Sequence, residues 1–388
     1  MNVSVGIHDI AFSSGHYALD SATLAAHHGV NAAKYIVGLG QTAQTVPAAD
    51  EDIVTMAACA ARRIIDRHGT GGIRTVLLAT ETGIDQAKSA GIYVHHLIGL
   101  PPATRVVELK QACYSGTCAL QMAAAMVARD PTERVLVIAT DVARYDLDSK
   151  GEPTQGAGAV AMLIAAEPAV AVVEPVSGVY TADIADFWRP NHRTTAIADG
   201  KLSIAAYLHA VEQAWKDYET RGGHELSAFA AFCYHQPFTR MAYKAHARLL
   251  EMNGVAATDE RLHRDLHATT IYNAAIGNSY TASLYIALLS LLDHADDLAG
   301  KPIGLFSYGS GCVAEFFSVT VVPGYRRHLR TEVNRSVITN RVGISYEKYL
   351  ALRREPDPDR DRDIRVEGRG PFRLSAVRGC RRIYEASG

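Results

Sequence analysis

The chain has 388 residues, which is too long for one minimal core and predicts two domains or two fused halves. Its 39 Lys and Arg against 41 Asp and Glu leave a formal charge of −2, which indicates neither a nucleic-acid-binding surface nor an acidic tail. No apolar run reaches the roughly 18 residues of a membrane span, and no basic region followed by an apolar core opens the chain. We therefore expect a cytoplasmic protein with no membrane or nucleic-acid partner.

Short apolar runs alternate with longer helical patterns over the first 175 residues. An apolar stripe with helical spacing predicts a helix over 53–69, capped by Asp50. The run TVLLA over 75–79 fits a strand buried on both faces. A second helix is expected over 114–128, and further strands over 3–12, 105–109, 135–139, 160–165 and 170–174. This order predicts a layered βαβ unit with a buried central sheet.

The rest of the chain shows the same alternation of apolar strand runs and helical patterns. Helices are expected over 204–218, 239–250 and 280–292, and strands over 229–234, 303–306 and 313–321. The charged, Pro-broken stretch 353–363 predicts a solvated loop, and 365–385 a returning strand or a cover. The fold class is therefore α/β, with two similar βαβ-rich halves over 1–175 and 176–388.

Cys113 lies where the strand pattern VVELKQA gives way to a helix rich in small residues. The unpaired N–H groups and the dipole of a helix N-terminus favour the thiolate, which is the nucleophilic form of cysteine. A small buried cysteine explains the same residues equally well. The six cysteines are too scattered for a disulfide scaffold, so reduced thiols are expected.

Two other ionisable groups follow buried strands. Glu81 comes directly after 75–79, at the end of a strand where α/β folds place active-site groups. His235 follows the run FAAFCY, and a histidine there can act as a general acid or base near neutral pH. Taken singly, each is better explained as a surface carboxylate or as a core histidine.

Gly-rich turns and adjacent histidines complete the candidate sites. The segments 151–162, 276–283 and 305–312 are turns that could close around a ligand with backbone N–H groups. None is a dinucleotide or P-loop motif in the right context, so nucleotide binding is weakly indicated. The pairs His27–His28 and His95–His96 lack the i, i+4 spacing of a helical metal site, so no metal is expected.

The combination of segments is more specific than any one of them. The chain carries, in this order, TETGID, ELKQACYSGT, GEPTQGAGAVAML, DFWRP, YHQPFTRMAYKAH, GNSYTAS and LFSYGSG. In this order they resemble the 3-hydroxy-3-methylglutaryl-CoA (HMG-CoA) synthases, within the thiolase-like condensing enzymes. The resemblance implies a five-layer αβαβα fold built from two similar halves, and a homodimer.

The resemblance also implies roles for particular residues. Cys113 matches the cysteine that takes an acetyl group as a thioester, and Glu81 matches the base that removes a proton from its methyl group. His235 matches the histidine that positions the acetoacetyl thioester and assists proton transfer at its ketone. Substrate-binding positions are implied at Tyr145, Thr154, Ser203, Arg240, Lys244, Asn278 and Ser310. Arg240 stands where the family more often has Lys, which keeps the charge but binds phosphate differently.

The implied reaction is an aldol-type condensation followed by hydrolysis. An acetyl group on Cys113 becomes an enolate, attacks an acetoacetyl thioester, and water releases the HMG thioester. Backbone N–H groups around Cys113 and Ser310 are candidate oxyanion donors. No cofactor or metal is expected: the substrates are acetyl-CoA and acetoacetyl-CoA, in the mevalonate pathway.

Three alternatives differ in carrier or in class. Enzymes that install β-branches in polyketides use acyl carrier proteins with phosphopantetheine thioesters, and YSGT and GSGC look like theirs. DFWRP and the basic segment Arg240–Lys244 look like CoA-using synthases, and we rank that reading first. A scaffold that binds thioesters without turnover would have lost a catalytic group. Cys113, Glu81 and His235 are all present, which argues against this alternative. Ketoacyl synthases and thiolases pair their cysteine with His/His or His/Cys, whereas a glutamate favours the aldol-type outcome.

Overall fold

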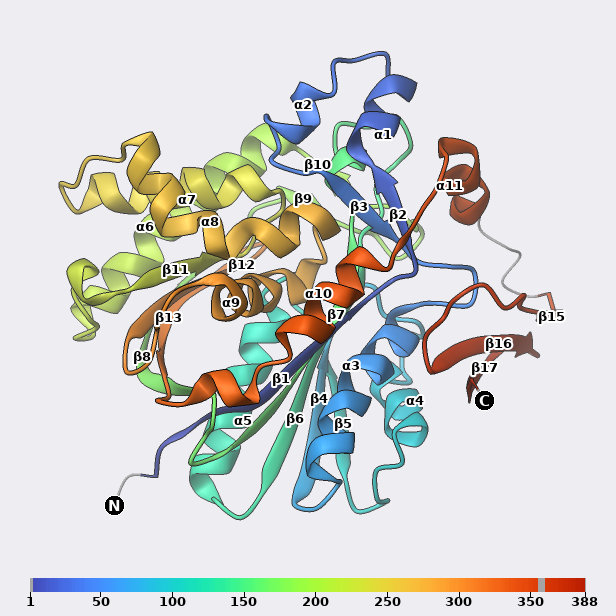
Figure 1. Cartoon of the computed structure of the whole chain (residues 1–388), viewed down its shortest axis with the longest axis horizontal. Helices are drawn as coiled ribbons and strands as arrows, with labels where there is room; N and C mark the ends of the chain where they lie inside the picture. Colours follow the sequence, from blue (N-terminus) through green and yellow to red (C-terminus); the bar gives the residue numbers. More distant parts are fainter. Residues whose placement is uncertain (1–2, 355–359, 388) are drawn as a thin grey trace.

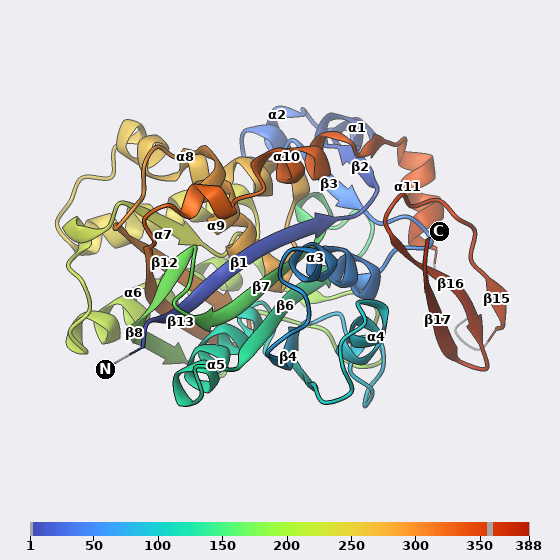
Figure 2. The same ribbon diagram turned by 60° about the horizontal axis from the view of Figure 1, so that its bottom comes forward.

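One nine-stranded mixed sheet runs through the computed structural model, which describes residues 3–354 and 360–387 (Figures 1 and 2). The strands lie in the order β11-β12-β13-β8-β1-β7-β6-β4-β5. Their bounds are β1 Val5–Ser14, β4 Ile73–Ala79, β5 Arg105–Leu109, β6 Arg134–Val142, β7 Ala157–Ala166, β8 Ala171–Thr181, β11 Ala231–Tyr234, β12 Pro302–Gly309 and β13 Val313–Val321. The strands of the first 170 residues meet those of the later part where β1 pairs with β8.

Helices pack against both faces of this sheet, in one central layer and two outer layers. The larger ones are α3 Ile53–His68, α4 Ala90–Leu97, α5 Ser115–Arg129, α6 Gly200–Thr220, α7 Thr239–Met252, α8 Asp259–Ile276 and α9 Ser283–His294. Helices α5 and α9 pack in one core with strands from both ends of the sheet. Helices α3 and α4 form a second core on the outer face of β4, β6 and β7, and α6 and α7 a third on β11, β12 and β13.

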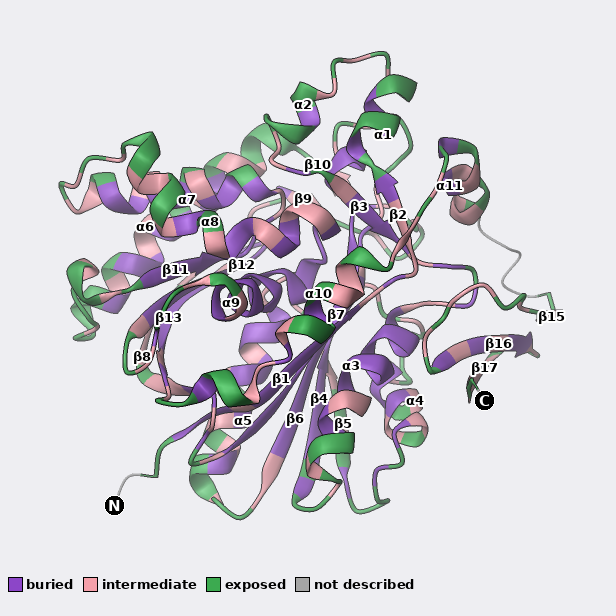
Figure 3. Ribbon diagram, viewed as in Figure 1, coloured by how far each residue is buried: buried purple, intermediate pink, exposed green. Residues whose placement is uncertain are grey.

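Successive side chains along each strand point to opposite faces of the sheet, and this alternation creates the layers. On β6, Val135 and Val137 face the central helices while Leu136 faces α3. On β12, Leu305 faces the central helices while Phe306 faces α6 and α7. Strands that bury both faces need continuous apolar runs, which explains why these segments lack a polar alternation. Figure 3 shows the central strands and α9 buried and the outer helices exposed on one side. The layer order αβαβα expected from the resemblance is confirmed.

The N-cap of helix α3 lies two residues after the expected one. Asp52 accepts hydrogen bonds from the N–H groups of Val54 and Thr55 and forms a capping box with Thr55. Asp50 instead accepts from the backbone N–H groups of Glu367 and Gly368, near the C-terminus. The expected cap is therefore wrong, because a carboxylate from a loop can bind a distant segment that local spacing does not reveal.

The C-terminal part returns to the N-terminal half. Strands β16 Phe372–Arg378 and β17 Arg381–Ala386 form a hairpin beside α3 and α4 (Figure 1). Phe372 belongs to the core under α3, so the segment is a cover as expected. Of the expected loop over 353–363, residues 355–359 lie outside the described residues, and β15 Arg362–Asp363 pairs with β16.

Smaller elements complete the described residues. They are β2 Tyr17–Asp20, α1 Ser21–His27, α2 Ala33–Ile36, β3 Ala43–Val46, β9 Phe187–Trp188, β10 Ile197–Ala198, α10 Thr331–Thr339, β14 Val342–Gly343, α11 Tyr346–Arg353 and the 3-10 turns η1 Glu152–Thr154, η2 Leu226–Ala228, η3 Tyr280–Ala282 and η4 Tyr325–His328. Within the described part of the chain, no helix is long and apolar enough to cross a membrane.

Candidate active site

Cys113 and Glu81 meet at the ends of two neighbouring parallel strands. Glu81 follows β4, and Cys113 lies in the turn between β5 and α5. Because β4 and β5 are parallel and paired, their carboxyl ends lie side by side. The Cys113 thiol donates a hydrogen bond of 2.9 Å to Glu81 Oε1. The two residues that the resemblance names as nucleophile and base are therefore in direct contact.

The environment of this pair raises both pKa values. Burial raises the pKa of Glu81 to about 8, and the nearby Asp141 carboxylate adds to the effect. Burial and then the Glu81 carboxylate raise the pKa of the Cys113 thiol well above its ordinary value. The expectation that the start of α5 favours the thiolate is wrong, because enclosure and a neighbouring acid outweigh the helix dipole. The thiol therefore needs a base, and Glu81 is within reach.

Asp141, at the end of β6, holds the loop that carries Glu81. This fully buried carboxylate accepts hydrogen bonds from the Glu81 N–H at 2.9 Å and the Thr82 N–H at 3.0 Å. Its other oxygen accepts from the Thr281 N–H at 3.0 Å and the Thr281 hydroxyl at 2.5 Å. One carboxylate thus joins the base loop of the first half to the turn before α9.

His235 directly follows β11 and is almost completely buried. Burial lowers its pKa to about 3, so the imidazole is neutral at physiological pH. Its Nδ1 atom has no hydrogen-bond partner among the described residues. The Tyr207 hydroxyl donates to the His235 carbonyl at 2.6 Å, and Cys113 contributes to the raised pKa of Tyr207. Tyr207 therefore connects the histidine with the surroundings of the thiol.

Tyr145, Thr154, Asn278 and Tyr280 form a connected group near the Cys113–Glu81 pair. Cys113 and Glu81 both contribute to raising the pKa of Tyr145, after burial, and to raising that of Tyr280. The Asn278 N–H donates to the Thr154 carbonyl at 2.9 Å, and its Oδ1 accepts from the Tyr280 N–H at 2.9 Å. Tyr280 has a positive φ of 46°, an uncommon value for a residue with a side chain and one that clusters at functional sites.

The hairpin between β12 and β13 brings Ser310 to the cysteine turn. The Gln111 side-chain amide donates to the Ser310 carbonyl at 3.3 Å. A Cβ on Gly309 would lie 2.5 Å from the Gln111 carbonyl oxygen, so only glycine allows this approach. Asp186 fixes the hairpin by accepting from the Gly311 N–H at 3.0 Å and the Tyr308 hydroxyl at 2.8 Å.

The remaining predicted positions lie farther from the pair. Arg240 and Lys244 are exposed on the first two turns of α7, which begins four residues after His235. The Arg240 guanidinium lies 4.9 Å from the Tyr243 ring centroid and donates to the Val37 carbonyl at 3.1 Å. Ser203 lies in the first turn of α6, half-buried, and nothing recorded for the described residues connects it with Cys113.

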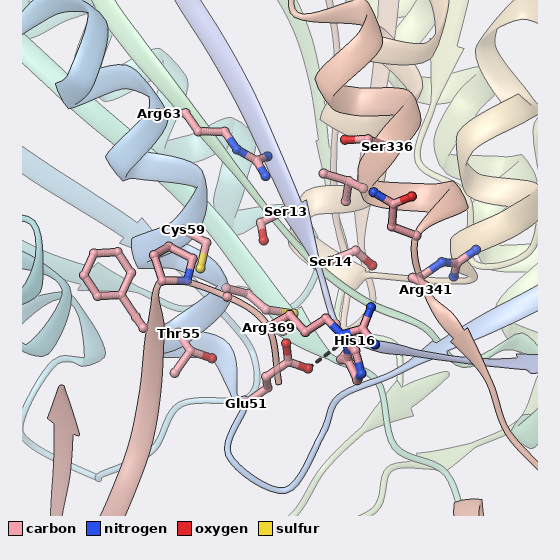
Figure 4. Close-up of a pocket in the computed structure, with 17 residues that line it drawn as sticks. Ser13, Ser14, His16, Glu51, Thr55, Cys59, Arg63, Ser336, Arg341 and Arg369 are labelled. Carbon is pink, nitrogen blue, oxygen red and sulfur yellow. Dashed lines mark hydrogen bonds between the residues drawn. The ribbon is translucent and has the colours of Figure 1, made fainter. Parts of the chain in front are cut away.

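A separate cavity of about 450 Å³ contains none of the predicted site residues. It lies between the end of β1, α3, α10 and the segment before β16 (Figure 4). The side chains of Glu51, His16, Arg341 and Arg369 gather in it. It is therefore separate from the Cys113–Glu81 pair.

Comparisons with known proteins agree with this geometry. Models of the N-terminal and C-terminal domains of hydroxymethylglutaryl-coenzyme A synthase match residues 2–169, and residues 170–261 and 250–359. The chain belongs to the hydroxymethylglutaryl-CoA synthase family. It is 39% identical over 383 residues to a hydroxymethylglutaryl-CoA synthase of Enterococcus faecalis, an alignment that covers 98% of this chain and 100% of that protein.

Two solved synthases of this family are complexes with different carriers, one with CoA and one with an acyl carrier protein. An HMG-CoA synthase complexed with CoA superposes with a TM-score of 0.94 at 37% identity, over 99% of this chain and 100% of that one. The curacin pathway HMG synthase in complex with holo donor acyl carrier protein superposes with a TM-score of 0.93 at 31% identity, over the same shares. The family fold is therefore common to both carriers and does not choose between them.

Sequence reasoning left several positioning residues of this synthase-family site unassigned. Asp186 and Arg189 belong to the quoted segment DFWRP, and Arg189 donates to the Glu81 carbonyl at 3.1 Å. Asp141, Tyr207 and Tyr280 carried no signal, because an acid after a strand or a tyrosine in an apolar segment is common. The contacts of Asp141 and Tyr207 span 28 to 140 residues of chain, which local spacing does not encode.

Proposed function

We propose that the protein is a hydroxymethylglutaryl-CoA synthase that condenses acetyl-CoA with acetoacetyl-CoA. The observation that carries the proposal is the 2.9 Å hydrogen bond from the Cys113 thiol to Glu81. A thiol of raised pKa in contact with a carboxylate can lose its proton as it attacks a thioester. The carbon–sulfur bond of acetyl-CoA breaks, acetyl-Cys113 forms, and the proton leaves with the CoA sulfur.

Glu81 then acts on the acetyl methyl group. A methyl beside a thioester carbonyl is weakly acidic, so its base must be strong and shielded from water. Burial makes Glu81 such a base, since its pKa lies at about 8. The enolate oxygen needs hydrogen-bond donors, which we assign to backbone N–H groups near Cys113 and Ser310. The enolate carbon attacks the ketone carbon of the second thioester and forms the new carbon–carbon bond.

His235 serves the acceptor ketone. As a neutral imidazole it can donate a hydrogen bond to the ketone oxygen, and it can assist the proton transfer that turns the new alkoxide into a hydroxyl group. Water then cleaves the Cys113 thioester and releases the HMG thioester. These steps use side chains and backbone groups of this chain, and we propose that no cofactor takes part.

Two observations favour CoA as the carrier. The CoA-bound neighbour is more similar in sequence than the carrier-protein-bound one, at 37% against 31% identity. Arg240 and Lys244 are exposed cations without a recorded acidic partner in the described residues, as phosphate binding requires. The same cations would also attract the acidic surface of a carrier protein. Polyketide β-branching on carrier proteins is therefore the second candidate function.

A comparison of donors tests the proposal. Purified protein receives acetyl-CoA with acetoacetyl-CoA, or the same groups on carrier proteins, while intact mass is followed on protein and product. Rapid acetylation by acetyl-CoA and free HMG-CoA support the proposal. Acetylation from a carrier protein alone, with HMG on an acceptor carrier, establishes the second candidate. No acetyl adduct from either donor refutes both.

Variants of α7 test the binding surface. Arg240→Ala and Lys244→Ala are expected to raise the KM for acetyl-CoA several-fold with little change in kcat. Arg248→Ala is the matched control, because Arg248 lies on the same helix but pairs with Glu212 at 2.6 Å. If the KM for acetyl-CoA in Arg240→Ala and Lys244→Ala equals that of the parent and of Arg248→Ala, these cations do not bind CoA. We also propose that the protein is a cytoplasmic homodimer. Sedimentation of the purified protein tests the dimer.

A further inference from the structure

Two histidines and a carboxylate converge away from the reaction centre. His27 is the last residue of α1 and His28 follows it, while Asp148 lies in the loop between β6 and η1. The Nε2 atoms of His27 and His28 lie 3.3 and 3.6 Å from the same atom, Asp148 Oδ1. One ligating atom from each residue lies within 4.8 Å of the other two. The two segments are about 120 residues apart in the chain, so tertiary structure alone brings them together.

Neighbouring aromatic residues hold both imidazoles in this orientation. The His27 ring stacks on the Tyr346 ring with centroids 3.5 Å apart and planes 17° apart. The His28 Nδ1 atom lies 2.7 Å from the Tyr35 hydroxyl, which directs Nε2 toward the carboxylates. A hydrogen bond at the second ring nitrogen is the arrangement by which proteins orient metal-binding histidines.

A second carboxylate adds negative charge at the same place. Glu152 is completely buried, and its Oε2 atom lies 3.2 Å from His28 Nε2. This oxygen also accepts from the Asp148 N–H at 2.6 Å, and the other oxygen accepts from the Tyr349 hydroxyl at 2.9 Å. Two carboxylates and two neutral imidazoles would balance the charge of a divalent cation.

We propose that His27, His28 and Asp148 bind a divalent transition-metal ion of the zinc class, with Glu152 as the charged neighbour that holds His28 and Asp148. Ligands at about 2.0–2.1 Å in a tetrahedral site are roughly 3.3 Å apart, close to the 3.3 and 3.6 Å separations here. Imidazole and carboxylate ligands suit zinc better than calcium or magnesium, which prefer oxygen alone. The Asp148 side chain is 71% exposed, so water can take the fourth position.

The bound ion would fasten α1 to the loop that supplies the substrate pocket. Tyr145 and Thr154 flank the segment that carries Asp148 and Glu152, and both border the Cys113 site. The ion would therefore act as a structural clamp on this loop, and it would not take part in the condensation. Its existence does not depend on the proposed reaction, because the ligand geometry stands without it.

Metal titration of the full chain tests this site. Zn²⁺ binding is measured by calorimetry, and Co²⁺ binding by its visible absorption, both in the Cys113→Ala background so that the catalytic thiol does not contribute. We expect one tight equivalent per chain and a thermal midpoint that rises with Zn²⁺ concentration. His27→Gln and Asp148→Asn are each expected to weaken binding at least tenfold.

The second histidine pair provides a matched control. His96 and His95 lie at the end of α4 in the same sequence arrangement, and no carboxylate is recorded beside them among the described residues. His96→Gln should therefore bind Zn²⁺ like the parent. Equal affinity of the parent, His27→Gln and Asp148→Asn would overturn the site, as would loss of binding in His96→Gln alone. Circular dichroism of each variant separates lost binding from lost folding.

Discussion

Asp141 accepts a hydrogen bond of 2.9 Å from the backbone N–H of Glu81, so a buried acid positions a half-buried one. Its charge also contributes to the raised pKa of Glu81. Because the same carboxylate binds Thr281, the position of Glu81 depends on how the turn before α9 packs against β6. Four predictions follow from this arrangement and from the cavity beside α3.

Removing the nucleophile and removing the base should block different steps. Cys113→Ala has no sulfur to acylate, so no acetyl adduct should form. Glu81→Ala should acetylate more slowly, because no carboxylate is left to take the thiol proton. It should still accumulate acetyl-enzyme, because loss of that charge removes one cause of the raised thiol pKa. It should make no HMG thioester, since no base remains for the methyl proton. Intact mass with a radioactive acetyl donor checks both; labelled Cys113→Ala would refute the nucleophile.

The acetylation rate should depend on the protonation of Glu81. Its pKa of about 8 means that the carboxylate fraction falls about tenfold per pH unit below that value. The kcat/KM for acetyl-CoA, which reports on the free enzyme, should therefore rise with pH and level off near pH 8. In Glu81→Ala the levelling near pH 8 should be absent, because the rate then follows the thiolate fraction of a thiol whose pKa burial still raises. A parent profile that is flat from pH 6 to 9 would contradict the proposed role of the pair.

Asp141→Asn should affect rate and pH dependence together. Loss of the negative charge lowers the pKa of Glu81, so the rise in kcat/KM should move to lower pH. Displacement of the base loop should lower kcat for condensation by about 10²-fold. Asp130→Asn is the control, since Asp130 is a half-buried acid whose carboxylate, among the described residues, hydrogen-bonds its neighbour Thr132. A lower kcat with an unchanged pH profile of kcat/KM would show that Asp141 has a structural role only.

Glu51 should make the folded state less stable at high pH. Burial raises its pKa from 4.5 to about 7, while its Oε2 accepts from the His16 N–H at 2.7 Å (Figure 4). A raised carboxyl pKa favours folding most below pH 4.5, and this contribution is lost as the pH rises to 7. The loss amounts to about 3 kcal/mol.

Glu51→Gln cannot ionise and should avoid this loss. Its amide oxygen can still accept the backbone hydrogen bonds of His16 and Ala48. Urea unfolding should therefore show the variant more stable than the parent at pH 8 and similar to it at pH 5. A variant that is less stable at both values would show that Glu51 is ionised in the folded protein and stabilised by its neighbours.

Local patterns predicted the elements of the core well. The apolar runs at 75–79 and 135–139 became β4 and β6, because strands buried on both faces require continuous apolar sequence. Helix α8 was not predicted, since its 18 residues are largely polar and its apolar positions contact two different cores. The two halves over 1–175 and 176–388 stay a prediction.

The order of motifs along the chain was enough to identify the family, because residue type and spacing carry that information. The roles that the resemblance implies for Cys113, Glu81 and His235 stay predictions. The state of those groups was decided by tertiary structure. Cys113, expected as a thiolate at a helix N-terminus, is a protonated thiol, because burial and Glu81 act on it from outside its own segment. The neutrality of His235 likewise follows from burial under strands distant in sequence. Electrostatics depend on neighbours in space, and a linear pattern does not contain them.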